Sequence, residues 1–305
     1  MKLIPNLSLI ILLIFTGWAT NLSAQGCSDA GFCTIDGLKP QGSDSTSSIK
    51  TQIKIGVFIG KADHAIFASG AYVEFNKQVN DKLGFDLKLT SLAQSGNGIS
   101  TFGVSDVYAN LKYKLTHSFT GVVGIKIPLM RANKSLDGLP LPMDYQASLG
   151  TFDLVVGLGY KWKGIELVAA WQQPLTQNDN QFFSSVYPEE SELRRFQSTH
   201  KFQRKGDVLL RLSYPIKLGE KWKFTPSILP IYHLGNDLFT DELDVEREIE
   251  GSEGLTLNGN LYLDYQLNAK NSLQLNTGSP FIVRDERPDG LTRSYIITLE
   301  YKFKF

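Results

Sequence analysis

Four histidines are the side chains best suited to acid–base chemistry in this chain: His64, His117, His200 and His233. His117 is followed directly by Ser118, so a base and a hydroxyl are adjacent there. Successive residues of an extended chain point to opposite sides, which places these two poorly for a nucleophile–base pair. The sequence also has no Gly-x-Ser-x-Gly or His-Glu-x-x-His pattern. We therefore expect neither a catalytic site nor a cofactor.

The first residues have the features of a secretory signal peptide. Lys2 precedes an apolar run, Leu9-Ile-Ile-Leu-Leu-Ile-Phe15, and the stretch ends on the small residue Ala24. A basic start, a short apolar core and a small residue at the exit are typical of an exported precursor. We predict cleavage after Ala24. A retained anchoring helix is the alternative.

Cysteine chemistry is confined to Cys27 and Cys33, which lie just after this cleavage point in Gly26-Cys-Ser-Asp-Ala-Gly-Phe-Cys33. Export permits a disulfide, and the short spacing would close a small loop. Lipid attachment at Cys27 and two free thiols are the alternatives. Two thiols with no histidine nearby do not indicate a metal site.

Charge and composition exclude several classes of protein. The 305 residues carry 31 basic and 31 acidic side chains, and this balance argues against nucleic-acid binding, which needs a basic excess. A mean hydropathy of −0.13 excludes a bundle of membrane helices. Tyrosine, phenylalanine and glycine are abundant, which favours β structure.

The elements that position these side chains follow a period of two residues. In the last segment Tyr295, Ile297, Leu299, Tyr301, Phe303 and Phe305 alternate with mainly polar residues. Such alternation gives a strand one apolar and one polar face. The same pattern predicts twelve strands, near 51–60, 66–78, 82–93, 103–115, 119–130, 151–162, 164–173, 206–218, 221–233, 254–268, 271–281 and 292–305.

Alternation alone does not distinguish a soluble barrel from a membrane barrel, but the connections do. Tight turns are expected near 80–81, 116–117, 163–164, 219–220 and 269–270. Longer polar loops are expected between them, near 94–102, 131–150, 174–205, 234–253 and 282–291. Short turns at one end and long loops at the other, with an even strand number, are typical of outer-membrane barrels. We predict a single up-and-down antiparallel transmembrane β-barrel with long extracellular loops, short periplasmic turns and both termini in the periplasm.

Aromatic residues support this prediction. Several lie near strand ends, where a girdle would meet the lipid headgroups. The chain also ends on Tyr301, Phe303 and Phe305, which share one face of the last strand. This ending resembles the C-terminal signature by which the assembly machinery of the bacterial outer membrane recognises and inserts barrels.

The Gly26–Cys33 element, the barrel layout and the closing strand together resemble the outer-membrane transporter-like proteins of Bacteroidota. Those proteins are loosely akin to the meta-pathway phenol-degradation barrels and the fatty-acid transporter superfamily. The resemblance implies passage of small solutes, hydrophobic ones among them. No substrate-binding motif of that group can be matched in this sequence.

In a membrane barrel the polar face of each strand lines the interior, because ionised groups in hydrocarbon are costly. This rule predicts a set of lumen-lining side chains. They are Lys54, Asp86, Lys88, Asp106, Lys112, Lys126, Asp153, Glu166, Arg211, Lys223, Asn258, Asn260, Asp264 and Glu300. They could form a structural lattice of ion pairs or line a path for solutes.

Three loop segments have unusual compositions. Residues 234–253 carry eight acidic side chains against Arg247, which could bind a divalent cation or simply be solvated. The stretch 188–205 is rich in Arg and Lys and could pair with the acidic loop or with lipopolysaccharide phosphates. Residues 136–143 are apolar for an exposed loop. They could fold inward, take up an apolar solute or pack on neighbouring loops.

The sequence thus predicts a signal peptide (1–24), an N-terminal periplasmic or lumenal segment (25–50) and a barrel (51–305). The expected function is a passive channel or transporter for small solutes in the outer membrane. Its expected partners are membrane lipid, lipopolysaccharide and the barrel assembly machinery, with no nucleic acid. The alternatives are a scaffold barrel with a plugged lumen that binds a partner through its loops, and an outer-membrane hydrolase.

Overall fold

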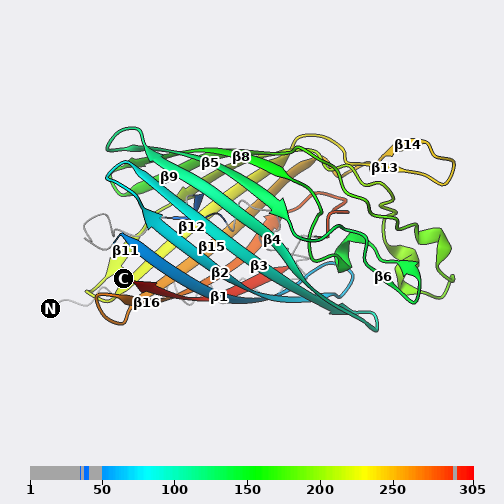
Figure 1. Ribbon diagram of the computed structural model, residues 1–305, viewed down its shortest axis with the longest axis horizontal. Helices are drawn as coiled ribbons and strands as arrows, with labels where there is room; N and C mark the ends of the chain where they lie inside the picture. The colour runs from blue at the N-terminus through cyan, green and yellow to red at the C-terminus, as the bar shows by residue number, and fades with distance from the viewer. Residues whose placement is uncertain (1–34, 36–37, 41–49, 291–293) are drawn as a thin grey trace.

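A computed structural model describes residues 35, 38–40, 50–290 and 294–305, and within them the chain forms a β-barrel (Figure 1). The barrel strands alternate in direction along the sequence, except that two consecutive segments form one of them. They are β1 (Thr51–Lys61), β2 (Phe67–Gln78), β3 (Leu83–Gly96), β4 (Ile99–Lys114), β5 (Phe119–Pro128), β8 (Asp153–Trp162), β9 (Ile165–Pro174), β10 (Asp207–Ser213), β11 (Ile216–Leu218), β12 (Trp222–His233), β15 (Gly254–Gln266), β16 (Asn271–Ile282) and β17 (Tyr295–Lys304).

The barrel is closed, because each strand is hydrogen-bonded to a neighbour on both sides. β1 pairs with both β2 and β17, and β12 pairs with both β15 and β10. The short β11 continues the line of β10 and also pairs with β12, so the thirteen strand segments make twelve barrel strands. All pairings are antiparallel between neighbours around the ring, as predicted for an up-and-down barrel.

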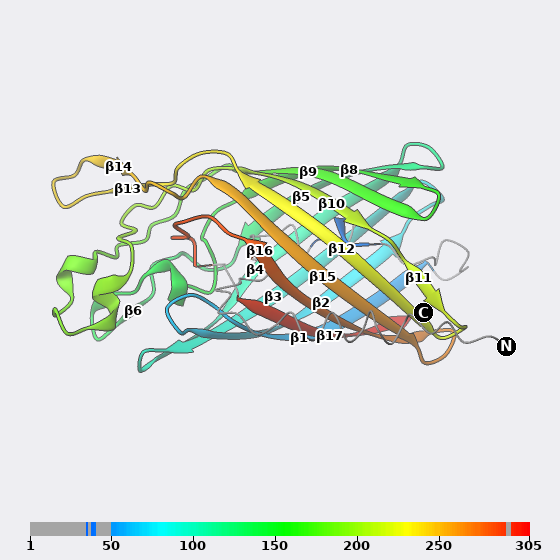
Figure 2. The ribbon, with the colours of Figure 1, turned by 180° about the vertical axis from the view of Figure 1, so that it is seen from behind.

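The two ends of the barrel differ. Short turns and the C-terminus lie at one end, called here the short-turn end (Figures 1 and 2). At the opposite, long-loop end the connections carry additional structure. These elements are the hairpins β6 (Ser135–Leu136)–β7 (Leu139–Pro140) and β13 (Leu238–Thr240)–β14 (Glu246–Glu248), and the 3₁₀ turns η2 (Met143–Tyr145), η3 (Ser184–Val186) and η4 (Glu192–Arg195).

One predicted loop is wrong. The sequence 94–102 is not a long loop, because β3 continues to Gly96 and β4 begins at Ile99. The connection is Asn97-Gly98, with φ angles of 52° and 76°. Asn and Gly adopt positive φ at low cost, and this pair matches the twist of the flanking strands in a two-residue hairpin. The strands are therefore longer on this side of the barrel than predicted.

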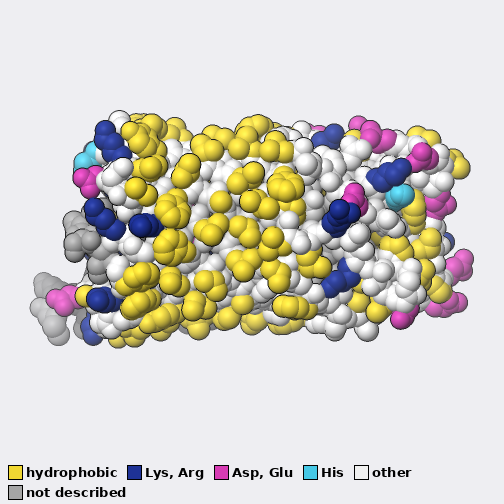
Figure 3. All heavy atoms as spheres, in the orientation of Figure 1, with side chains coloured by type: hydrophobic (Ala, Val, Ile, Leu, Met, Phe, Trp, Pro, Cys, Tyr) yellow, Lys and Arg dark blue, Asp and Glu magenta, His cyan; other side chains and the backbone are white. Residues whose placement is uncertain are grey.

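The outer wall of the barrel is apolar. Leu261 and Leu299 are 43% and 48% exposed, whereas Asn260 and Glu300, their neighbours in sequence, are 2% exposed. Figure 3 shows hydrophobic side chains around the middle of the barrel and charged ones towards both ends. An apolar outside around a charged inside is the arrangement expected of a barrel in lipid. No helix in the described part of the chain is long and apolar enough to cross a membrane.

Candidate functional site: the interior of the barrel

The structure places the predicted lumen-lining side chains inside the barrel. Eleven of the fourteen residues are at most 9% exposed. The side chains of the other three, Lys112, Lys223 and Asp264, are 15–16% exposed. Most of the ionised ones meet an opposite charge across neighbouring strands, as in the pairs Lys112–Asp86 (2.9 Å) and Lys126–Asp153 (2.8 Å). A strand pairing places such partners within reach of each other.

One side of the interior, formed by β1, β2, β3 and β17, is strongly charged. We define the charged wall as Lys54, Tyr72, Glu74, Lys88 and Glu300. Lys54 Nζ lies 2.9 Å and Lys88 Nζ lies 3.7 Å from the Glu74 carboxylate. The Tyr72 hydroxyl donates to Glu300 Oε2 at 2.5 Å, and Lys88 Nζ lies 3.6 Å from the centre of the Tyr72 ring. Each charge is thus held by a defined partner.

The opposite side contains a patch without charges. We define the apolar wall by eight buried residues of β4, β5, β8, β9, β10 and β12 that form one cluster. They are Tyr108, Val122, Val155, Val168, Ala170, Leu209, Leu229 and Ile231. An apolar patch inside a membrane barrel has no lipid to face, so it needs another apolar group to cover it. Two residues from the N-terminal part of the chain, Ile35 and Leu38, complete this cluster.

Leu38 lies in the interior between the two walls. It is fully buried, and its backbone carbonyl accepts a hydrogen bond from the guanidinium of Arg211 on β10. A Cβ on Gly157 of β8 would lie 2.7 Å from Leu38 Cδ2, so the glycine leaves the space that the leucine fills. The next residue, Lys39, crosses to the charged wall, where its Nζ lies 3.7 Å from Glu300 Oε2. We call Ile35 and Leu38–Pro40 the lumenal segment.

The long-loop end of the interior is filled by the connection between β5 and β8. Leu141, Met143 and Tyr145 are at most 1% exposed. Ser148 donates to Asp106 Oδ1 of β4 at 2.6 Å, and Gln94 of β3 donates to the Gln146 carbonyl at 2.7 Å. These bonds attach the loop to the inner wall. Of the apolar stretch 136–143, Leu141 and Met143 pack against neighbouring loops, in clusters that include Phe182 and Ile249. Leu136 and Leu139 are 44% and 37% exposed.

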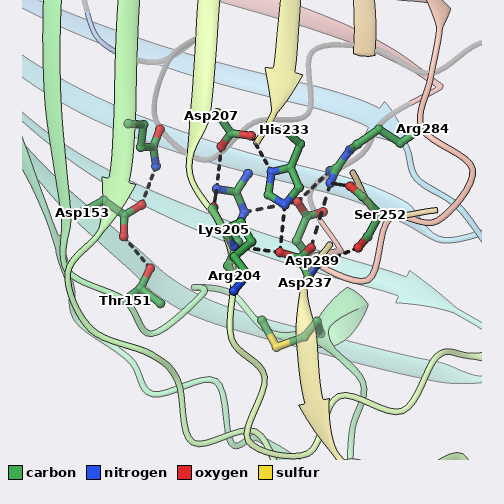
Figure 4. Close-up of polar contacts among 12 residues, drawn as sticks. Thr151, Asp153, Arg204, Lys205, Asp207, His233, Asp237, Ser252, Arg284 and Asp289 are labelled. Atoms are coloured by element: carbon green, nitrogen blue, oxygen red, sulfur yellow. Dashed lines mark hydrogen bonds and ion pairs between the residues drawn. The ribbon is translucent and has the colours of Figure 1, made fainter. Parts of the chain in front are cut away.

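A second cluster of buried charged residues lies at the long-loop end of the barrel (Figure 4). Of the four histidines only His233 is fully buried; its Nδ1 lies 2.7 Å from Asp207 and its Nε2 2.8 Å from Asp237. A neutral imidazole has a single N–H, so both contacts are satisfied only by a protonated ring. Three more buried residues from the loops complete this rim cluster: Arg204 contacts Asp207 (2.6 Å) and Asp289 (3.4 Å), and Arg284 contacts Asp289 (3.1 Å).

The other histidines lie apart from each other. His117 and Ser118 lie in the exposed turn at the short-turn end. His64 and His200 lie in outer loops. The His64 ring lies 4.1 Å from the Phe196 ring in a tilted contact, and the His200 ring meets Phe183 edge-on at 4.5 Å between ring centres. Burial lowers the pKa of His64, although Asp63 opposes the shift. Burial also lowers the pKa of His200.

The acidic and basic loop stretches contact each other, one of the two possibilities that the sequence left open. Lys201 Nζ lies 2.9 Å from Asp244, and Gln203 donates to Glu246 at 2.6 Å. A hydrogen bond from Lys201 lowers the pKa of Asp244. Within the described residues, no three His, Cys, Asp or Glu side chains are grouped so that they could hold a metal ion.

Several interior residues were missed by the sequence analysis. Glu74 continues the polar face of β2 and could have been found from its alternation. The contact of Asp207 with His233 follows from the predicted hairpin, since strands that turn at 219–220 bring these positions opposite each other. The lumenal segment has no periodic signal. Cys27, Cys33 and the signal peptide lie outside the described residues, whereas Tyr301, Phe303 and Phe305 point outward from the end of the chain, 37–52% exposed.

Comparison with known proteins shows a likeness of fold to other outer-membrane barrels and nothing finer. No known protein family and no curated protein matches the sequence. Among solved structures, the translocator domain of the autotransporter NalP from Neisseria meningitidis is similar with a TM-score of 0.50 and 10% identity, over 88% of this chain and 91% of that chain. The CymD monoaromatic hydrocarbon channel matches with a TM-score of 0.48 and 10% identity, over 94% and 99%. A Pseudomonas aeruginosa FadL homologue matches with 0.40 and 8%, over 86% and 91%. At such identities the likeness is one of fold alone.

Proposed function

We propose that this protein is a channel of the bacterial outer membrane that passes small solutes, with its termini and short turns on the periplasmic side. The observation that carries the proposal is the distribution of side chains in the barrel. The closed barrel encloses charged groups and turns its apolar side chains to the exterior. The signal peptide and the aromatic C-terminal strand expected from the sequence support export and insertion by the assembly machinery. The kinship with Bacteroidota transporter-like barrels belongs to the same proposal.

Two elements inside the barrel would restrict passage through this channel. The lumenal segment fills the middle of the barrel, and the connection between β5 and β8 fills the long-loop end. Neither element is a barrel strand, so both can move without breaking the wall. The apolar wall beneath Leu38 supports the passage of solutes with an apolar part. We place no catalytic step in this protein.

Proteoliposome uptake tests this function. Liposomes that contain the mature full chain or its Leu38→Asp variant are diluted into isosmotic solutions of small sugars, amino acids or aromatic solutes. Light scattering then follows their swelling. We expect slow swelling with the unaltered chain and faster swelling with Leu38→Asp, because a carboxylate is unfavourable on the apolar wall. Absence of swelling with both proteins, for every solute, would refute the channel.

A scaffold barrel is the second candidate, and the filled interior favours it. In that case the outer hairpin β13–β14, whose Leu243 is 79% exposed, would be the surface for a partner. The same swelling assay separates the two functions, since a scaffold stays silent when the lumenal segment is displaced.

A further inference from the structure

The lumenal segment occupies a site that recognises three features of a peptide at once. The Leu38 side chain fills the space above Gly157, the Leu38 carbonyl accepts from Arg211, and the Lys39 ammonium lies 3.7 Å from Glu300. Two of these contacts come from β8 and β10, which lie two strands apart on the side of the apolar wall, and the third comes from β17 in the charged wall. All three wall residues are part of the rigid barrel, so the site persists when the segment leaves.

We infer that the interior is a binding site for short peptides in which a leucine-like residue precedes a basic one, and that the lumenal segment is its resident occupant. This inference rests on the proposed channel function and names the solute class of the same site.

The chemistry of the site favours a peptide over a simple hydrocarbon. Arg211 is fully buried and donates to the Leu38 carbonyl, a contact that a peptide carbonyl can reproduce and a hydrocarbon cannot. Glu300, 2% exposed, likewise faces the Lys39 ammonium. A ligand that offers an apolar group, a carbonyl and a cation in that order replaces all three contacts.

Gly157 sets the size of the apolar pocket. An added Cβ there would lie 2.7 Å from Leu38 Cδ2 and 3.3 Å from Ala170 Cβ. Gly159 is two residues further along β8 on the same face, and a Cβ there would meet its nearest atoms at 3.7 and 3.9 Å, which is ordinary contact. Gly157→Val should therefore fill the pocket, and Gly159→Ala is the matched control that should not.

Isothermal titration of the mature full chain in detergent tests the site with a capped peptide, Gly-Leu-Lys-Pro, that copies residues 37–40. We expect binding to the Leu38→Asp variant at least tenfold tighter than to the unaltered chain, where the segment competes. Replacement of the peptide's Leu by Ser, or of its Lys by norleucine, should weaken binding at least tenfold. Gly157→Val combined with Leu38→Asp should abolish binding, and Gly159→Ala combined with Leu38→Asp should retain it. Heat-modifiable gel mobility establishes that each variant is folded.

Equal binding of the three peptides, or no binding to the folded Leu38→Asp variant, would overturn the inference. Tighter binding of hexanoate than of the peptide would also overturn it, in favour of a site for apolar anions. The channel can fail separately. Swelling without peptide binding refutes the peptide site alone, whereas peptide binding without any swelling refutes the channel and leaves the site.

Discussion

The apolar wall and the charged wall face each other across the same lumen, yet they are stabilised in different ways. The charged wall is complete in itself, because Glu74 is paired with Lys54 and Lys88, and Glu300 with Tyr72. The apolar wall is covered only when Ile35 and Leu38 join it. The difference indicates that the charged wall belongs to the permanent structure of the barrel, whereas the apolar wall is the part whose cover can be exchanged.

The largest effect is expected from breaking the charged wall. Glu74→Leu removes the carboxylate between two buried ammonium groups, and loss of one partner of a buried ion pair costs about 3–5 kcal/mol. Urea unfolding in detergent or lipid should show this loss. As a control, Glu74→Leu combined with Lys54→Met and Lys88→Met should recover most of it, since no buried charge is then left alone. A single Glu74→Leu variant as stable as the unaltered protein would show that the charged wall is not self-contained.

A second prediction compares the two contacts of the lumenal segment. Leu38→Ala should weaken its docking by about 2–5 kcal/mol, the usual loss for a buried leucine. Lys39→Met should weaken it less, by about 1.5 kcal/mol, because the Lys39–Glu300 distance is long at 3.7 Å and Glu300 keeps its hydrogen bond from Tyr72. Protease cleavage of the N-terminal segment in the intact barrel measures both. If Lys39→Met were the more sensitive variant, the apolar wall would not be the main anchor.

The outer face behind the charged wall gives the third prediction. Leu299 points outward beside the inward Glu300. Leu299→Arg or Leu261→Arg should cost about 2–4 kcal/mol near the middle of the bilayer. Asn260→Arg, on the inner face, avoids the cost of lipid exposure. Similar losses at Leu261 and Asn260 in a lipid unfolding assay would contradict the assigned faces.

The smallest effect concerns the outer hairpin, which neither wall contacts. The hydrogen bond from Lys201 lowers the pKa of Asp244, so its contribution is fully present above the ordinary Asp value of about 4. It is lost as the pH falls through the lower pKa of the folded state. Amide hydrogen exchange at β13–β14 should therefore be faster in acid than its intrinsic pH dependence predicts, and Asp244→Asn should remove this excess. An excess that survives in Asp244→Asn would assign it to another group.

The sequence predicted the barrel strands and the faces of their side chains far better than the residues that occupy the lumen. Period-two alternation encodes which face of a strand meets lipid, so the twelve strands and the inward position of residues such as Lys54 and Glu300 could be found without coordinates. The partner of each charge depends on register, which the alternation leaves open, and the loop predicted at 94–102 failed because Asn97-Gly98 is itself a hairpin turn. The position of Leu38 depends on a pocket assembled from six strands, which no local pattern records.

Single-channel recording in planar bilayers tests most directly whether the lumenal segment closes the barrel. The mature full chain and its Leu38→Asp variant are inserted under identical conditions, with Leu243→Asp on the exposed outer hairpin as the control. The account predicts long silent periods for the unaltered chain and for Leu243→Asp, and steady conductance for Leu38→Asp. Equal conductance of all three proteins would contradict it.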